Sequence, residues 1–139
     1  MRSLPLYLGA FCLVLGCGGG RQTGTVSGRV TMDGKPLPDA VVNFQPMSEG
    51  RNSGIGSSGR TDANGEYTLR LIDDTRDGAM IGKHRVMIKE STTSDPTNDK
   101  RRAGGDVVPA EYHIKSTLTF DVKPGHNTAN WDLESKKKK

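Results

Sequence analysis

Apolar and polar residues alternate one by one along most of the chain beyond residue 24. This period of two is typical of a β-strand with one face buried and the other in water. Six runs show it: 25–31, 40–45, 66–71, 83–89, 117–123 and 129–133. No segment has the 3.6-residue period of an amphipathic helix. We therefore expect an all-β fold built from antiparallel sheets.

The alternation also gives each run an inward face. The side chains expected in the core are Phe44, Leu69, Val86, Ile88, Leu118, Phe120, Val122 and Trp131. Turn-forming residues separate the runs. At 62–65 a hairpin turn is expected, in which Asp62 can cap the backbone two residues on and Gly65 can take a positive φ. A turn at 123–127 is expected to close the last hairpin, and the polar stretches 46–56 and 91–105 are expected to be surface loops.

The first residues have the layout of an export signal. Arg2 precedes an apolar run over 4–15. A membrane-spanning helix needs about 20 apolar residues, so this run is too short to remain in the bilayer.

The end of that run, Val14-Leu15-Gly16-Cys17, resembles the lipobox of bacterial lipoproteins. The resemblance implies that a diacylglyceryl group is attached to Cys17 and that the signal peptide 1–16 is removed. Cys12 does not fit, because Phe11 is too large to precede the cut. The alternative is an ordinary secretory leader in which Cys17 is incidental. In the lipoprotein reading the protein is exported and held in the membrane by lipid on Cys17, and residues 17–24 form a glycine-rich tether.

Charge does not favour a nucleic-acid partner. Of 20 Lys and Arg residues, Arg2 and the four C-terminal lysines lie outside the domain, which leaves 15 against 16 Asp and Glu. This near-neutral body has no basic face interleaved with aromatic residues. The Lys-rich tail, 135–139, is expected to be solvated, with weak attraction to anionic lipid as the alternative.

Two stretches, 26–42 (VSGRVTMDGKPLPDAVV) and 61–69 (TDANGEYTL), resemble the carboxypeptidase regulatory-like domain. That family has a transthyretin-like (prealbumin-like) β-sandwich of about seven strands, which would here cover residues 25–134. The segments 108–112 and 122–127 are similar to small lipoproteins of planctomycete-type bacteria. These motifs bear on fold and say little about activity.

Candidate sites for chemistry are few. Asp62, Asn64 and Glu66 are the weak candidates for a calcium site, but three oxygen ligands at one turn fall short of the six to eight that calcium prefers. The three histidines have no paired spacing: His84 shares a strand face with apolar residues, and His113 and His126 lie elsewhere. With Cys17 lipidated, no thiol remains for a metal site or disulfide. We expect no cofactor.

Enzymes known on transthyretin-like folds have motifs that this chain lacks. It does not end in the Tyr-Arg-Gly-Ser of hydroxyisourate hydrolases, and it lacks the His-x-His pair of intradiol dioxygenases. Tyr112 and Trp131 are expected to anchor the core rather than to stack on a ligand. Tyr112 is also expected to hydrogen-bond to the backbone, as a corner tyrosine does.

These observations predict a non-catalytic module on the cell envelope, with a structural role or one in binding an envelope protein or a glycan. The alternative is an enzyme or metal-binding domain of unrecognised type on the same fold. The sequence identifies no ligand, membrane face or oligomeric state.

Overall fold

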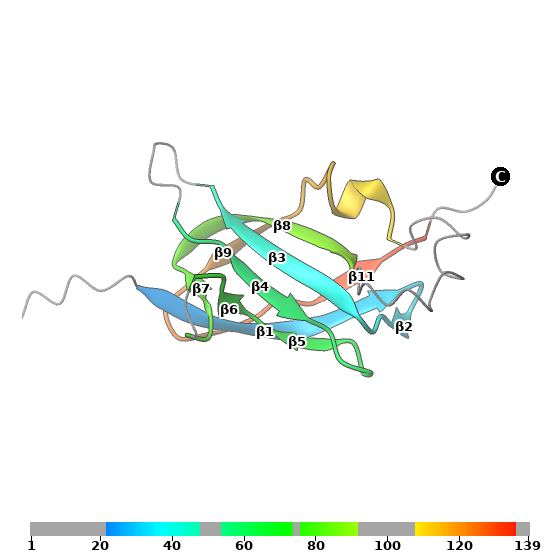
Figure 1. The fold of residues 1–139 in the computed structure, drawn as a ribbon, viewed down its shortest axis with the longest axis horizontal. Coiled ribbons are helices and arrows are strands. Elements are labelled where there is room, and N and C mark those ends of the chain that lie inside the picture. The colour runs from blue at the N-terminus through cyan, green and yellow to red at the C-terminus, as the bar shows by residue number, and fades with distance from the viewer. Residues whose placement is uncertain (1–21, 48–53, 74–75, 92–107, 136–139) are drawn as a thin grey trace, which may run out of the picture.

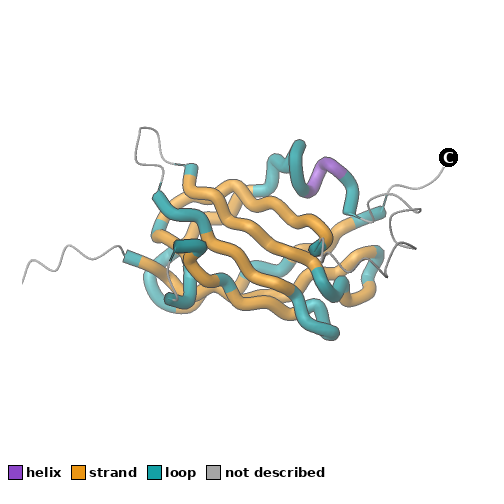
Figure 2. Tube along the Cα trace, in the orientation of Figure 1, coloured by secondary structure: helices purple, strands orange, loops and turns teal. Residues whose placement is uncertain are grey.

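The computed structural model describes residues 22–47, 54–73, 76–91 and 108–135, and within these ranges the chain is mainly β-strand. Two sheets pack against each other around a shared core (Figure 1). The one helical element among these residues is a short 3-10 turn, η2 (Ala110–Tyr112), beside the second sheet (Figure 2). The expected all-β sandwich is confirmed.

The first sheet is organised around a long strand, β1 (Thr23–Met32). Its partners are β2 (Lys35–Pro36), β5 (Glu66–Thr68), β7 (Ala79–Met80), β10 (His126–Thr128) and β11 (Trp131–Leu133). The pairings with β2, β5 and β7 are antiparallel. Those with β10 and β11 are parallel, so the first and last strands of the domain run side by side in the same direction.

The second sheet has the strand order β6-β4-β3-β8-β9, and all its pairings are antiparallel. Its strands are β3 (Ala40–Pro46), β4 (Ser57–Arg60), β6 (Arg70–Leu71), β8 (Gly82–Glu90) and β9 (Thr119–Val122). β3 lies at its centre: Phe44 is opposite Val86 on one side and Ser57 on the other.

The core contains the inward side chains of both sheets. Phe44, Leu69, Val86, Ile88 and Val122 are buried, as the alternation predicts. Leu118, Phe120 and Trp131 pack against the core on the predicted inward face, but they are only partly buried. Phe120 lies on β9, the edge strand of the second sheet, where no further strand covers it. Its ring still packs on Phe44, with centroids 5.7 Å apart.

Two segments that the sequence predicted as a single strand and as a hairpin turn instead connect the two sheets. The run 66–71 is divided between the sheets: β5 pairs with β1, and β6 pairs with β4. The change occurs at Leu69, whose backbone N–H donates to the carbonyl of Val26 on β1. The expected hairpin at 123–127 was also wrong, because this turn joins β9 in the second sheet to β10 in the first. The side chain of Asn127 closes the turn through hydrogen bonds with both the N–H and the carbonyl of Lys123.

β1 begins at Thr23, two residues inside the segment expected as a tether. Within the described ranges, the structure contains no helix of the length and apolarity needed to cross a bilayer. The predicted leader 1–16, Cys17, the lysines of the tail and most of the loops 46–56 and 91–105 lie outside the described residues.

Candidate functional site

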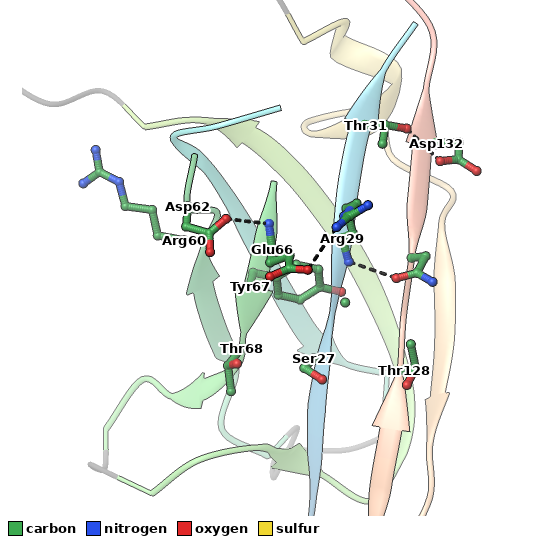
Figure 3. A pocket seen from close by; sticks show the side chains of 12 residues that line it. Ser27, Arg29, Thr31, Arg60, Asp62, Glu66, Tyr67, Thr68, Thr128 and Asp132 are labelled. Atoms are coloured by element: carbon green, nitrogen blue, oxygen red, sulfur yellow. Dashed lines mark hydrogen bonds and ion pairs between the residues drawn. The ribbon is translucent and has the colours of Figure 1, made fainter. Parts of the chain in front are cut away.

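A polar groove with a volume of about 910 Å³ crosses the outer face of the first sheet (Figure 3). Its base is the outward side of β1, where Ser27, Arg29 and Thr31 alternate with inward Val26 and Val30. The groove is thus a product of the same period of two that builds the core. Neighbouring strands extend each of these three positions into a row.

The first row consists of three hydroxyl groups. The Cα of Ser27 is the register partner of Thr68 on β5 and of Thr128 on β10. Side chains at such paired positions point to the same face of a sheet. Each hydroxyl can both donate and accept a hydrogen bond.

The second row combines a guanidinium, a carboxylate and an amide. The Nη2 of Arg29 donates to the Oε1 of Glu66 on β5 over 3.0 Å. On the other side, the backbone N–H of Arg29 donates to the side-chain Oδ1 of Asn130 over 2.9 Å. While this oxygen accepts from the backbone, the Nδ2 group of the same Asn130 amide can donate to a ligand.

The remaining lining residues form the end and one wall of the groove. The hydroxyl of Thr31 donates to the Oδ1 of Asp132 on β11 over 2.7 Å. Arg60 and Asp62 lie where β4 ends and the following turn begins, and Arg60 also pairs with Asp39 over 3.1 Å. The groove therefore has two guanidinium groups and three carboxylates, and its lining contains no histidine or cysteine. It suits a ligand that offers hydroxyl or amide groups.

Tyr67 on β5 and Gly28 on β1 form the floor, where β1 comes close to the backbone of Ala129. The two residues are register partners, and the hydroxyl of Tyr67 donates to the carbonyl of Ala129 over 2.6 Å. A Cβ on Gly28 would lie 1.8 Å from that same carbonyl oxygen. Burial raises the pKa of Tyr67 above its ordinary value, while a hydrogen bond from Trp131 lowers it by less. This phenol is consequently held in its neutral, structural form.

The turn at 62–65 has the predicted cap and glycine, but the expected hairpin was wrong, because β4 before it belongs to the second sheet and β5 after it to the first. The Oδ1 of Asp62 accepts from the backbone N–H groups of Asn64 (2.8 Å) and Glu66 (2.9 Å), and Gly65 has a φ of 74°. Asp62 and Glu66 both line the groove, but their oxygens already bind these N–H groups and Arg29. The described residues contain no group of three or more His, Cys, Asp or Glu side chains arranged to hold a metal.

The histidines do not come together. His84 is buried on β8, where its Nδ1 lies 2.9 Å from the carbonyl of Gly82. His113 follows η2, and His126 begins β10 with its Nδ1 3.2 Å from the hydroxyl of Thr25. Burial lowers the pKa of His84, and hydrogen bonding to Gly82 and the charge of Asp121 oppose this more weakly.

Tyr112 and Trp131 are both partly buried against the core. The Tyr112 hydroxyl accepts a hydrogen bond from the backbone N–H of Glu134 over 3.1 Å, which is the predicted bond to the backbone. The indole N–H of Trp131 donates to Tyr67 over 3.0 Å.

Most of the groove is formed by outward residues of strands, for which the sequence predicted no site. The alternation in 25–31 and 129–133 shows which residues point outward. It does not show that Arg29, Asn130 and Asp132 lie next to one another. Their meeting depends on the parallel pairing of the first and last strands, which no local pattern encodes.

Comparison with known proteins gives structural similarity but no sequence match. No protein-family model matches the chain, and no curated protein is similar to it. A DUF3823 family protein from Parabacteroides merdae, known as a crystal structure, aligns with a TM-score of 0.49 and 15% sequence identity. The alignment covers 84% of this chain and 48% of that protein, so this chain spans about half of its length.

Proposed function

We propose that this protein is a membrane-anchored lipoprotein of the bacterial envelope, lipidated on Cys17, whose β-sandwich is a non-catalytic module that binds a partner through the polar groove. The partner is an envelope protein or a glycan. The resemblance of 26–42 and 61–69 supports a carboxypeptidase regulatory-like, transthyretin-like domain within the all-β sandwich.

The observation that carries the anchor is the short distance between a lipobox-like motif and a folded domain. Val14-Leu15-Gly16-Cys17 ends an apolar run of export-signal length, and β1 begins only at Thr23. Two or more acyl chains hold a protein stably at a membrane, whereas one chain gives marginal binding. A lipid on Cys17 would thus hold the sandwich close to the bilayer surface.

The states of the charged and titratable side chains support a non-catalytic role. Arg29 is paired with Glu66, and Asp132 accepts from Thr31, so these groups stabilise the sheet surface. Among the described residues, the two groups with shifted pKa values, Tyr67 and His84, are buried. Catalytic groups, by contrast, need an accessible position near the reacting atoms of a substrate.

Mass spectrometry of the mature protein tests the anchor. We expect an N-terminal Cys17 carrying acyl mass, and we expect Cys17→Ser to leave the precursor uncut or to release the domain from membranes. A mature N-terminus further along the chain, with unmodified mass, would contradict the lipoprotein assignment.

Site-specific photo-crosslinking in intact cells tests the groove. A photoreactive residue at Thr128, in the groove, should give a discrete adduct that the same residue at Thr119 does not give. Thr119 is an exposed threonine on β9, in the other sheet, and is therefore a matched control. The adduct at position 128 should be lost when Asn130→Ala removes the amide beside it. Equal adducts at both positions would contradict a role for the groove.

A further inference from the structure

One end of the sandwich gathers the start of β1 and the ends of several other strands. Thr23 is the register partner of Met80, and the backbone N–H of Ile81 donates to the carbonyl of Gln22. At the same end, the backbone N–H of Met47 donates to the carbonyl of Lys83 over 2.9 Å. Figure 1 shows this end on the left, where β1 begins beside β7.

Two large apolar side chains are exposed at this end. Met47, just after β3, is 50% exposed, and Ile72, just after β6, is 67% exposed. The backbone N–H of Ile72 donates to the carbonyl of Gly56, and a Cβ on Gly56 would lie 3.2 Å from the Cδ1 of Ile72 and 3.5 Å from the side chain of Gln45. Ile72 therefore lies near the end of β3, at roughly two strand spacings, about 10 Å, from Met47. We call Met47 and Ile72, with Lys83 beside them, the N-terminal corner.

The corner belongs to the second sheet, opposite the groove. In β3, Phe44 points into the core and Gln45 is exposed, so Met47 continues the outward phase. In β6, Leu71 is buried, and Ile72 again follows on the outward side. Contact through this corner would leave the polar groove of the first sheet free.

Covalent geometry limits how far this end can lie from a lipid on Cys17. Six residue steps separate Cys17 from Thr23, and a fully extended chain spans at most about 3.6 Å per step, roughly 20 Å in total. β1 is ten residues long, so its far end lies about 30 Å further along the sandwich. The N-terminal corner is consequently on the part of the domain that the anchor holds nearest the bilayer.

We infer that the N-terminal corner docks on the lipid surface, with Met47 and Ile72 inserted among the headgroups and the groove facing away from the membrane. This inference rests on the proposed anchor at Cys17. Insertion removes two apolar side chains from water at an interface that the tether already places within reach.

The charged side chains around the N-terminal corner are compatible with lipid headgroups, but their net charge is small. Lys83 lies beside Met47, and Lys123 is 3.7 Å from Asp121 on the neighbouring edge strand. Near Ile72, Asp73 and Arg76 are both exposed. Three cations against two carboxylates give a small positive excess, so we expect docking on neutral lipid with a modest gain on anionic lipid.

The test uses the full chain, processed to its lipidated form and placed in phosphatidylcholine vesicles that contain brominated acyl chains. Cys12 and Cys17 are the two cysteines of the chain. Since the first is removed with the signal and the second carries lipid, an introduced cysteine is the one free thiol for a fluorescent label. Labels at Met47→Cys and Ile72→Cys are compared with Asn64→Cys, at the far turn, and Thr128→Cys, in the groove.

We expect the brominated lipid to quench labels at 47 and 72 several-fold more than labels at 64 and 128. Met47→Ser should lower the quenching of a label at 72, and adding phosphatidylglycerol should raise it slightly. Equal quenching at all four positions, or stronger quenching at 64 or 128, would overturn the inference while leaving the anchor intact. A pyrene excimer between labels at position 47 would show that a second copy of the chain covers the corner, and would also overturn it. Absence of acyl mass on the same sample would remove the anchor and the inference together.

Discussion

The hydroxyl of Tyr67 links the two edges of the first sheet, because it accepts a hydrogen bond from the indole N–H of Trp131 while donating to the carbonyl of Ala129. Tyr67 lies on β5, and Ala129 lies in the gap between β10 and β11. Gly28 on β1 is the register partner of Tyr67, and a Cβ there would lie 1.8 Å from the carbonyl oxygen of Ala129. One buried oxygen thereby connects β5 to β11 and to the segment between β10 and β11, below the polar groove.

Tyr67→Phe should lower the free energy of unfolding by about 1–3 kcal/mol, since it leaves the carbonyl of Ala129 and the indole N–H of Trp131 without their partner. Urea denaturation followed by tryptophan fluorescence measures this directly, because Trp131 is the one tryptophan in the chain. Thr68→Val, at the next, exposed position, should change stability by less than about 0.5 kcal/mol. A Tyr67→Phe variant as stable as the parent would show that the hydroxyl has no structural role.

Gly28→Ala should prevent folding or destabilise the domain severely. The new Cβ would lie 1.8 Å from the carbonyl oxygen and 2.5 Å from the carbonyl carbon of Ala129, and these are backbone atoms rather than the end of a flexible side chain. Ser27→Ala, one residue away and pointing into the groove, is the matched control and should melt normally. Yield of soluble protein and thermal melting separate the two outcomes. Normal melting of Gly28→Ala would contradict the close approach of β1 to Ala129.

The local features of this fold were predictable because neighbouring residues determine them. The cap at 62–65 forms as expected, since Asp62 bonds to N–H groups only two and four residues away. The inward phase of β3 and β8 also follows directly from alternation, and Phe44, Val86 and Ile88 are buried.

β4 was not predicted because it has almost no apolar content. Its sequence, Ser-Ser-Gly-Arg, offers no alternation, yet it pairs with β3 on one side and β6 on the other. Its position rests on backbone hydrogen bonds, which sequence periodicity does not report. Gly59 is needed there, since a Cβ would lie 2.5 Å from the carbonyl of Thr68.

The groove was not predictable for a related reason. Its rows form where Ser27 meets Thr68 and Thr128, three residues on strands far apart in the sequence. Alternation shows which side chains point outward, but register between distant strands depends on the whole packing arrangement. A polar outward phase therefore indicates a solvent-facing surface without indicating its chemistry.

The stability of the domain should fall as the pH drops below about 6.5, because His84 is buried and its folded-state pKa is lowered. Its Nε2 has no hydrogen-bond partner among the described residues, and the nearest opposing charge is Asp121 on β9. Below the unfolded pKa, the unfolded chain takes up a proton that the folded chain resists. This one group can therefore contribute a slope of at most about 1.4 kcal/mol per pH unit.

Urea denaturation between pH 7.5 and 5.5 measures this slope. His84→Leu should flatten it, whereas His126→Gln, at an exposed histidine, should leave it unchanged. A slope that survives in His84→Leu would assign the pH dependence to other groups.

The turn at 62–65 should stabilise the domain without calcium. Asp62→Ala removes the acceptor for two backbone N–H groups and should cost about 1–2 kcal/mol of unfolding free energy, as the loss of a capping carboxylate does. Asp62→Asn keeps the Oδ1 acceptor while removing the charge that a cation needs, so it should retain most of the stability.

Because Oδ1 of Asp62 already binds backbone and Oε1 of Glu66 binds Arg29, the melting temperature of the parent should be the same in millimolar calcium and in chelator. A bound cation present at 100 times its dissociation constant would add about 2.7 kcal/mol to the free energy of unfolding. Calcium stabilisation of that size, lost in both Asp62→Ala and Asp62→Asn, would assign a metal site to this turn, whereas loss of stability in Asp62→Ala alone identifies a structural cap.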